Sequence, residues 1–244
     1  VPQVVVFDTA FHQTMPAEAY MYALPYKYYE KYKIRRYGAH GTSHKYVSLR
    51  AAQILGKDPS ELKMVTCHLG NGSSISAVDG GKCVDTSMGF TPLAGLIMGT
   101  RCGDIDPAIV TYLMAKENIA PEEFSNIMNK KSGVLAVSGV SSDFREIDAA
   151  IEQGNERAKI ALSMFEYQIT KYIGAYAAAM GGVDAVVFTA GIGENNAALR
   201  ERCCSKLAFM GVEVDSEKNK TRGKEAIVSK DGAKVKVMVV PTNE

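Results

Sequence analysis

The sequence predicts an α/β fold in which a mixed sheet carries helical insertions. Asn71-Gly72 lies between two apolar stretches, and this dipeptide is the strongest short-range signal for a β-hairpin, here with a type I′ turn. The continuous apolar run 183–189 indicates a buried, parallel strand, and a glycine-rich turn and a helix follow it directly. In chain order, we expect the core elements βββ-α-β-α-β, with further helices inserted.

The composition excludes several classes of function. The 244 residues are 46% hydrophobic and 23% charged, and their net charge of +1 includes no long run of one sign, so the charge footprint of a nucleic-acid-binding protein is absent. No apolar segment approaches the roughly 20 residues that cross a bilayer, and we expect no signal peptide. The five cysteines form no C-x-x-C pair and have no histidine at metal-ligand spacing. We expect reduced thiols in a cytoplasmic protein with no membrane or nucleic-acid partner.

The first part of the chain predicts a strand, a packed loop and a helix. Residues 4–7 are apolar and indicate a strand that ends at Asp8. A carboxylate just past a strand lies where open α/β sheets place their ligands, but Asp8 is equally suited to cap the next turn. Residues 15–37 hold seven tyrosines and two prolines, which is typical of an ordered loop with short helical pieces. Ser43 is expected to cap a helix that runs to about Leu55 and stops at a glycine.

Two histidines lie at the start of this helix. His40 stands between two glycines, so its imidazole can approach a ligand closely, and its place before a helix favours anion binding. A single histidine is nevertheless more often structural. His44 is expected on the helix surface.

The hairpin predicted over 64–78 is a candidate phosphate site. Small residues make its turn tight, and such a loop exposes backbone N–H groups that can hold a phosphate. An ordinary surface hairpin is the alternative. The residues that ring the turn are His68, Gly70, Ser73 and Ser74. Gly80-Gly81 then turns the chain into a third strand, 82–86.

A glycine-rich loop after the third strand presents Arg101. An arginine in this setting is either a structural ion-pair partner or a fixed clamp for a phosphate. The loop ends at Asp106-Pro107, where a proline at the first position favours the start of a helix. Further helices are expected over 121–131, 141–154 and 155–180.

A second glycine-rich turn, 191–195, follows the buried strand and precedes a helix expected over 196–209. Strand, glycine turn and helix N-terminus together supply free N–H groups and a dipole equivalent to about half a charge, which is an anion-binding arrangement. Asp231-Gly232 predicts a hairpin turn, and 235–240 predicts the final strand.

Several of these stretches together resemble the acetate kinase (acetokinase) family of the actin, sugar-kinase and heat-shock ATPase superfamily. The resemblance runs through the whole chain in order, and it implies a ribonuclease-H-like fold of the actin/sugar-kinase type. The stretches that carry it are 7–12 (FDTAFH), 38–44 (GAHGTSH), 68–72 (HLGNG), the Arg101 loop, 143–145 (DFR), 191–195 (GIGEN) and 241–244 (PTNE).

The resemblance also implies a division of the chain. Residues 11–240 would form the nucleotide-binding domain, residues 1–10 would be a remnant of a missing N-terminal domain, and residues 241–244 would cross over toward that domain. The missing part would include a second phosphate loop and an asparagine and an arginine of the active site. The chain by itself is therefore expected to bind nucleotide but to turn over poorly.

The activity that the resemblance implies is transfer of the γ-phosphoryl group of ATP to acetate, which gives acetyl phosphate and ADP, with Mg²⁺ as cofactor. Such a reaction needs charge stabilisation and in-line alignment more than covalent chemistry. His40 and Arg101 would hold the equatorial oxygens, and Asp8 would act at the acyl site as an acid/base or through a metal-bound water. Glu244 would help to hold Mg²⁺. A homodimer through the long, alanine-rich helix is the expected assembly.

The nucleotide residues implied by the resemblance fall into three groups. The outer phosphates would be gripped by His68, Leu69, Gly70, Asn71 and Gly72. The ribose and adenine would be contacted by the segment Asp143, Phe144 and Arg145. The adenosine and α-phosphate side would face Gly191, Ile192, Gly193, Glu194 and Asn195.

One position departs from the family pattern. Ala39 stands where the family carries a phenylalanine that walls the pocket for the methyl group of the acid, and Pro92 would be another wall. A smaller wall favours a longer acid, so a propionate or butyrate kinase is the alternative within this class. The alternative outside it is a non-catalytic, actin-like nucleotide-binding module.

Overall fold

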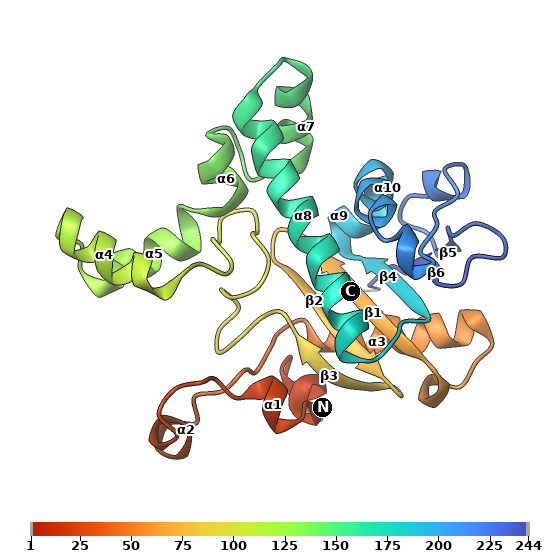
Figure 1. The fold of residues 1–244 in the computed structure, drawn as a ribbon, viewed down its shortest axis with the longest axis horizontal. Coiled ribbons are helices and arrows are strands. Elements are labelled where there is room, and N and C mark those ends of the chain that lie inside the picture. Colours follow the sequence, from red (N-terminus) through yellow and green to blue (C-terminus); the bar gives the residue numbers. More distant parts are fainter. Residues whose placement is uncertain (1, 243–244) are drawn as a thin grey trace.

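The computed structural model describes residues 2–242 and shows a mixed sheet with helices on both faces (Figure 1). Its six strands lie in the order β3-β2-β1-β4-β6-β5. They are β1 (Lys63–Leu69), β2 (Ser73–Asp79), β3 (Lys82–Thr86), β4 (Ala185–Thr189), β5 (Ala226–Ile227) and β6 (Lys236–Val239). β1 runs antiparallel to β2 and parallel to β4, and β4 runs parallel to β6. The predicted order of core elements is confirmed, and β5 adds an unpredicted edge strand.

The predicted helices are present, with several additions. They are α1 (Ala17–Tyr20), α2 (Lys27–Tyr32), α3 (Gly41–Leu55), α4 (Pro107–Glu117), α5 (Pro121–Lys130), α6 (Gly133–Ser138), α7 (Phe144–Glu152), α8 (Glu156–Ala179), α9 (Ala190–Asn195) and α10 (Ala197–Ser205). The start of α4 is confirmed, because the Asp106 carboxylate accepts a hydrogen bond from the Ala108 N–H at 2.9 Å. α3 ends at Gly56 as predicted, in the left-handed conformation that glycine adopts without cost. The loop 15–37 is ordered and contains α1 and α2.

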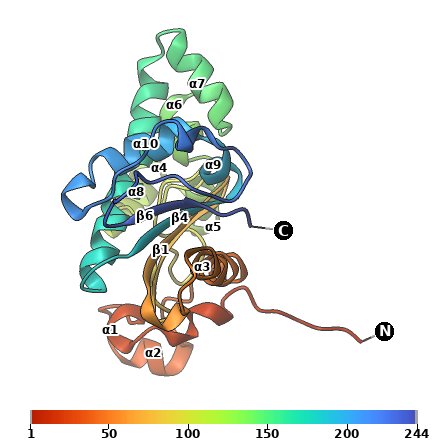
Figure 2. The ribbon, with the colours of Figure 1, turned by 90° about the vertical axis from the view of Figure 1, so that its right-hand side faces the viewer.

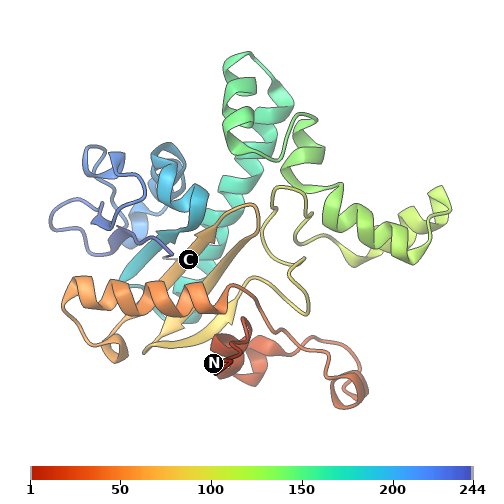
Figure 3. The same cartoon turned by 180° about the vertical axis from the view of Figure 1, so that it is seen from behind.

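The sheet is covered on both faces. α3 lies on one face, and α8 lies on the other with α7 and α10 beside it (Figures 2 and 3). Side chains of β1 alternate between the two layers, so Val65 and Cys67 pack with α8 whereas Met64 packs with α3. The helical pieces α2 and α4–α5 project from this body (Figure 1). None of the helices in the described part, 2–242, combines the length and the hydropathy that crossing a membrane requires.

The α3 face of β1 becomes polar toward the carboxyl end of the strand. Met64 belongs to the apolar layer, whereas Thr66 and His68 follow on the same face. Their antiparallel neighbours Ser76 and Ser74 are also buried and polar. Because buried polar groups need hydrogen-bond partners, this end of the sheet is built for a polar site.

The predicted strand at residues 4–7 is wrong. Residues 2–7 have no regular structure and extend away from the body of the molecule (Figure 2). Their apolar side chains are open to solvent, and Phe7 is 72% exposed. A strand needs a neighbour for its backbone groups, and no strand within residues 2–242 pairs with this segment. Apolar composition alone therefore did not define its structure.

Candidate functional site

All four histidines of the chain gather at the polar end of β1, between the sheet and α3. The rings of His40 and His68 stack with their centroids 4.0 Å apart. His44 lies 6.2 Å from His68 and 5.8 Å from His12 by the same measure. The prediction that His44 lies on the helix surface is wrong, because its side chain is fully buried.

His40 is held in a strained backbone position by Asp8. Its φ of +59° lies in the left-handed region, which a residue with a side chain rarely adopts. The Asp8 carboxylate accepts a hydrogen bond from the His40 N–H at 2.6 Å, and the Asp8 carbonyl accepts one from Gly41 at 2.9 Å. A Cβ on Gly41 would come within 2.2 Å of that carbonyl, so only glycine fits there. His40, not the predicted Ser43, therefore occupies the cap position of α3.

A chain of hydrogen bonds fixes the His40 ring. Its Nδ1 lies 2.8 Å from the Ser74 hydroxyl, which also lies 2.7 Å from Nε2 of His44. Nδ1 of His44 contacts the Thr66 hydroxyl at 2.7 Å, and that hydroxyl donates to the Ser76 carbonyl.

The donor and acceptor in each of these hydrogen bonds follow from the last one, in which Thr66 donates to the Ser76 carbonyl. Because Thr66 donates to a carbonyl, it accepts from Nδ1–H of His44. Burial lowers the pKa of His44 well below its usual value, so the ring is neutral and its Nε2 accepts the proton of Ser74. Ser74 then accepts from Nδ1–H of His40. In neutral His40 this leaves Nε2 with a free lone pair.

Arg101 and His40 converge on the turn between β1 and β2. A Cβ placed on Gly72 would lie 3.4 Å from Nη1 of Arg101 and 3.4 Å from Nε2 of His40. Burial is the first cause that lowers the pKa of His40, and the Arg101 charge adds to it against the opposing charge of Asp8. Nη1 of Arg101 also donates to the Pro92 carbonyl at 3.2 Å. The structure thus brings Gly72, His40 and Arg101 to one point.

The β1–β2 hairpin is confirmed, but its predicted type I′ turn is wrong. Leu69 pairs with Ser73, so the turn has three residues rather than two. Neither Asn71 nor Gly72 has a positive φ, which a type I′ turn requires at both central positions. The Gly70 N–H donates to the Gly72 carbonyl at 3.1 Å, which closes the longer turn. The Asn71 carbonyl accepts from Gly99 on the Arg101 loop at 3.2 Å.

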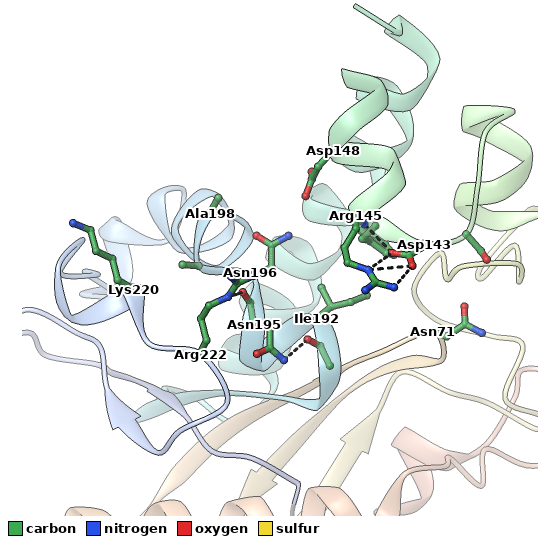
Figure 4. A pocket seen from close by; sticks show the side chains of 14 residues that line it. Asn71, Asp143, Arg145, Asp148, Ile192, Asn195, Asn196, Ala198, Lys220 and Arg222 are labelled. Carbon is green, nitrogen blue, oxygen red and sulfur yellow. Dashed lines mark hydrogen bonds and ion pairs between the residues drawn. The ribbon is translucent and has the colours of Figure 1, made fainter. Parts of the chain in front are cut away.

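A large cavity of about 880 Å³ opens beside this turn (Figure 4). Its walls come from the turn, the start of α7, the segment from α9 to α10, and a loop that precedes β5. The predicted residues among its lining are Asn71, Asp143, Phe144, Arg145, Gly191, Ile192 and Asn195. The predicted residues outside the lining are His68, Leu69, Gly70, Gly72, Gly193 and Glu194.

Comparison with known proteins decides the family. The profile of the acetokinase family matches residues 1–244. The chain belongs to the acetokinase family. It is 63% identical over 243 residues to the acetate kinase of Treponema denticola, covering 100% of this chain and 61% of the relative. It is 66% identical over 242 residues to the acetate kinase of Desulforamulus reducens, covering 99% and 61%.

Solved structures agree with the predicted fold of an acetokinase chain. The acetate kinase of Porphyromonas gingivalis superimposes with a TM-score of 0.95 at 56% identity, covering 97% of this chain and 59% of that one. A propionate kinase from Francisella tularensis gives 0.91 at 45% identity, covering 98% and 60%. The predicted actin/sugar-kinase type of α/β fold is confirmed. The chain spans about 61% of the length of the curated relatives.

In this acetokinase chain, the glycine-rich segment 191–195 is itself the short helix α9 and not a turn. Ala190, with a φ of +63°, makes the sharp change of direction from β4. The Glu194 carboxylate accepts a hydrogen bond from the Thr242 N–H at 3.1 Å, so it faces the segment after β6. The helix predicted over about 196–209 is present as α10, but it ends earlier than predicted, at Ser205, and a separate 3-10 turn follows.

Asp143 is both a helix cap and an ion-pair partner. Its carboxylate accepts from the Arg145 N–H at 2.9 Å and lies 2.6 Å from Nη2 of the same arginine. The hydrogen bond from the Arg145 side chain is the largest cause that lowers the pKa of Asp143, to about 2. Asp143 is therefore an ionised side chain of the cavity lining at neutral pH.

Pro92 contacts Arg101 directly, and Ala39 packs beside Met98, whose sulfur also contacts Arg101. Ala39 is buried in a small cluster with Met88 and Met98. Pro92 contacts Arg101 through its carbonyl. Glu244 lies outside the described residues. Within residues 2–242, no group of three His, Cys, Asp or Glu side chains is arranged to hold a metal.

Sequence reasoning missed part of the cavity wall. The unpredicted polar lining residues are Ser142, Asp148, Asn196, Lys220 and Arg222. The last two stand in the basic stretch 218–224, whose lysines and arginines were a usable signal for the wall of an anion-binding cavity. Asp148 carried no such signal, because it looks like any solvent-facing residue of a helix.

Proposed function

We propose that this chain carries the nucleotide site and much of the phosphoryl-transfer machinery of an acetate kinase. A carboxylate oxygen of acetate attacks the γ-phosphorus of ATP, the bond to the β,γ-bridging oxygen breaks, and ADP leaves with that electron pair. The convergence of Arg101 and His40 on Gly72 carries the proposal. A turn with exposed backbone, a fixed guanidinium and an imidazole at one point suit a transferring phosphoryl group.

His40 and Arg101 hold the equatorial oxygens of that group in this proposal. The guanidinium is always charged and donates in a fixed fork. The free Nε2 of His40 binds a phosphoryl oxygen after it takes up a proton, which the negative charge of the phosphoryl group favours. Stacking on His68 and the hydrogen bond to Ser74 hold the ring in place for this step.

Asp8 acts at the acyl site in this proposal. Its carboxylate already accepts hydrogen bonds from the N–H groups of His40 and Thr42, at 2.6 and 3.4 Å. It therefore couples the acyl site to the backbone that sets His40. Residues 143–145 and α9 hold the nucleoside in the cavity, and residues 68–72 hold the outer phosphates.

Mg²⁺ is part of the proposed reaction and fits a partly protein-bound site. This ion keeps several waters and binds through one or two carboxylates and the substrate phosphates. Asp8 is the carboxylate that the described residues offer beside His40, and Glu244 is the second proposed ligand. The ion would neutralise charge on the phosphates.

A propionate kinase is the second candidate. The Francisella tularensis propionate kinase shares the fold at a TM-score of 0.91, and Ala39 is smaller than the phenylalanine of the family pattern. Butyrate is the next longer acid in the same series. Both candidates use the same phosphoryl-transfer residues.

A hydroxylamine trap of the acyl phosphate tests the function. Because the curated relatives are longer, turnover is measured on a chimera in which this chain replaces the matching 61% of the Treponema denticola acetate kinase. We expect acetohydroxamate from the chimera with ATP and acetate, and ADP binding with little turnover by the chain alone. ADP binding without hydroxamate from the chimera would support the non-catalytic module instead.

We also propose a cytoplasmic homodimer. Ile160, Met164 and Tyr167 of α8 are spaced on one helical face and are 53%, 39% and 61% exposed. An exposed apolar stripe on a long helix suits a contact between two copies. Sedimentation of the chimera tests this, and a monomer at micromolar concentration contradicts it.

A further inference from the structure

Arg200 on α10 is a fully buried arginine with an unusual set of partners. Its side chain is the largest of the fully buried ones in the described part of the chain. Its guanidinium donates to the Asn219 side-chain oxygen at 2.8 Å and to three backbone carbonyls. These carbonyls belong to Gly193 at 2.8 Å, Asn219 at 2.7 Å and Thr221 at 3.0 Å. Within residues 2–242, no carboxylate lies within ion-pair distance of Arg200.

Asn219 extends this arrangement to a third segment. Its side-chain oxygen accepts from Nε of Arg200, and its amide donates to the Ala197 carbonyl at 2.8 Å. The Asn219 side chain is itself almost completely buried. We call these two residues the Arg200–Asn219 clamp. The clamp joins α9, the start of α10 and the loop 219–221.

The three joined segments are walls of the cavity. The lining residues Ile192 and Asn195 lie one residue before and two residues after Gly193, and Ala197 is itself in the lining. Lys220, another lining residue, lies between Asn219 and Thr221, which Arg200 binds. Figure 4 shows Arg222 beside Asn195 and Asn196, with Lys220 on the same loop segment as Arg222 and its ammonium directed away from them. Nε of Arg222 also donates to the Asn195 carbonyl at 3.1 Å. The clamp therefore lies behind the wall and fixes how its parts meet.

Arginine suits this task for a geometric reason. Its planar fork has five N–H donors and can satisfy several carbonyls at once. A buried charge without a carboxylate is costly, and an apolar side chain would fill the same space without that cost. Burial lowers the pKa of Arg200 to about 10, so it still carries its charge at neutral pH. The cost is offset by four hydrogen bonds to groups of the wall.

We propose that Arg200 and Asn219 are positioning residues that set the nucleoside wall of the cavity and thereby the affinity for the nucleoside. This rests on the proposed nucleotide site. The clamp touches no ligand itself. It acts by holding Lys220 and Arg222 against α9 and the start of α10.

Calorimetry with ADP and with adenosine tests the clamp on the full chain. Arg200→Met and the milder Asn219→Ala remove its hydrogen bonds, and Arg200→Lys keeps the charge with fewer donors. Because hydrogen bonds to a charged group are among the stronger ones, we expect their loss to raise the Kd of both ligands about tenfold or more. Arg200→Lys should recover part of the loss. Arg202→Met on the same helix, which breaks only the pair with Glu166, is the matched control.

Several results would overturn the proposal. One is an equal loss of affinity in Arg202→Met, which would indicate general destabilisation. Another is weaker ADP binding with unchanged adenosine binding, which would place the effect on the phosphates. Amide hydrogen exchange adds a test without ligand, because exchange in 191–197 and 218–223 should quicken in Asn219→Ala while β1 and β2 stay protected. Failure of the unmodified chain to bind ADP would refute the proposed nucleotide site, and unchanged exchange would refute the clamp.

Discussion

The hydroxyl of Ser74 lies 2.8 Å from Nδ1 of His40 and makes the imidazole the end of a directed hydrogen-bond chain. At the other end of this hydrogen-bond chain is the Ser76 carbonyl, which can only accept, so each group between it and His40 has a fixed role as donor or acceptor. The tautomer of His40 is thus set by residues of β1, β2 and α3, none of which needs to touch the phosphoryl group.

Removing this hydroxyl should slow catalysis with little change in nucleotide binding. In Ser74→Ala, Nδ1 of His40 and Nε2 of His44 both lose their partner, so the His40 ring is no longer held in one tautomer. Of the two lost hydrogen bonds, the one to His40 bears on the rate, and its loss of about 1–2 kcal/mol predicts a kcat about tenfold lower in the chimera. Ser76→Ala is the control, because its hydroxyl bonds Thr86 and no histidine. Equal kcat values for the two variants would contradict the directed chain.

Arg101→Ala should lower kcat far more than it weakens ATP binding. A guanidinium that acts mainly in the transition state is worth about a thousandfold in rate. The measurement is hydroxamate formation by the chimera together with ADP calorimetry. Arg50→Ala, which removes a surface pair with Glu225, is the control and should leave kcat unchanged. A kcat within about threefold of the parent corresponds to a change of under 1 kcal/mol in the activation barrier. Such a result would show that Arg101 has only a structural role.

Local sequence signals predicted the core of the fold because they coincide with its packing. The apolar run at β4 is buried on both faces, and Asp106 caps α4 through its own side chain. The run 4–7 carried the same apolar signal, but no strand within residues 2–242 pairs with it, so its prediction failed. The hairpin was found from Asn71-Gly72, but its turn type depends on the pairing of Leu69 with Ser73, which the dipeptide does not encode.

The candidate site was predicted least well at residues whose position depends on packing against distant parts of the sequence. His44 looks like a surface residue of a helix, and only the facing Thr66 and Ser74 make it a buried link. The glycines of 191–195 predicted a turn between the buried strand and the next helix. In the structure the left-handed residue is Ala190, and the glycines themselves belong to α9.

The buried histidines should make the chain less stable in mild acid. The pKa of folded His44 is lowered by burial, while the unfolded side chain titrates near about 6.5. Below that pH the unfolded state binds a proton that the folded state does not, so the free energy of unfolding falls as the pH falls, by about 1.4 kcal/mol per pH unit. His44→Gln removes this titration. Urea unfolding at several pH values between 7 and 5 should therefore give a shallower pH dependence for the variant, and parallel curves would contradict the assignment.

The substitution Ala39→Phe should shift the preference of the chimera toward acetate. Ala39 is buried beside Met88 and Met98, close to the loop that carries Arg101. A phenylalanine would fill the space beside the methyl group of the acid, whereas alanine leaves room for a further methylene. One methylene in an apolar pocket is worth about 1–3 kcal/mol. We therefore expect the parent to have the higher KM for acetate and a ratio of kcat/KM for propionate over acetate about tenfold above that of the variant.

Repacking of Met88 and Met98 beside Ala39 leads to a different expected result for Ala39→Phe. Methionine is flexible and fills irregular gaps, so Met88 and Met98 can close the space that Ala39 leaves. In that case the parent and Ala39→Phe would show the same ratio of kcat/KM for propionate and acetate. The variant would also lose stability, because the added ring overpacks the cluster at a cost of about 1–3 kcal/mol. Measuring both the ratio and the urea midpoint separates the outcomes. A shifted ratio with an unchanged midpoint places Ala39 at the acyl pocket, and an unchanged ratio with a lowered midpoint places it in the packing behind that pocket.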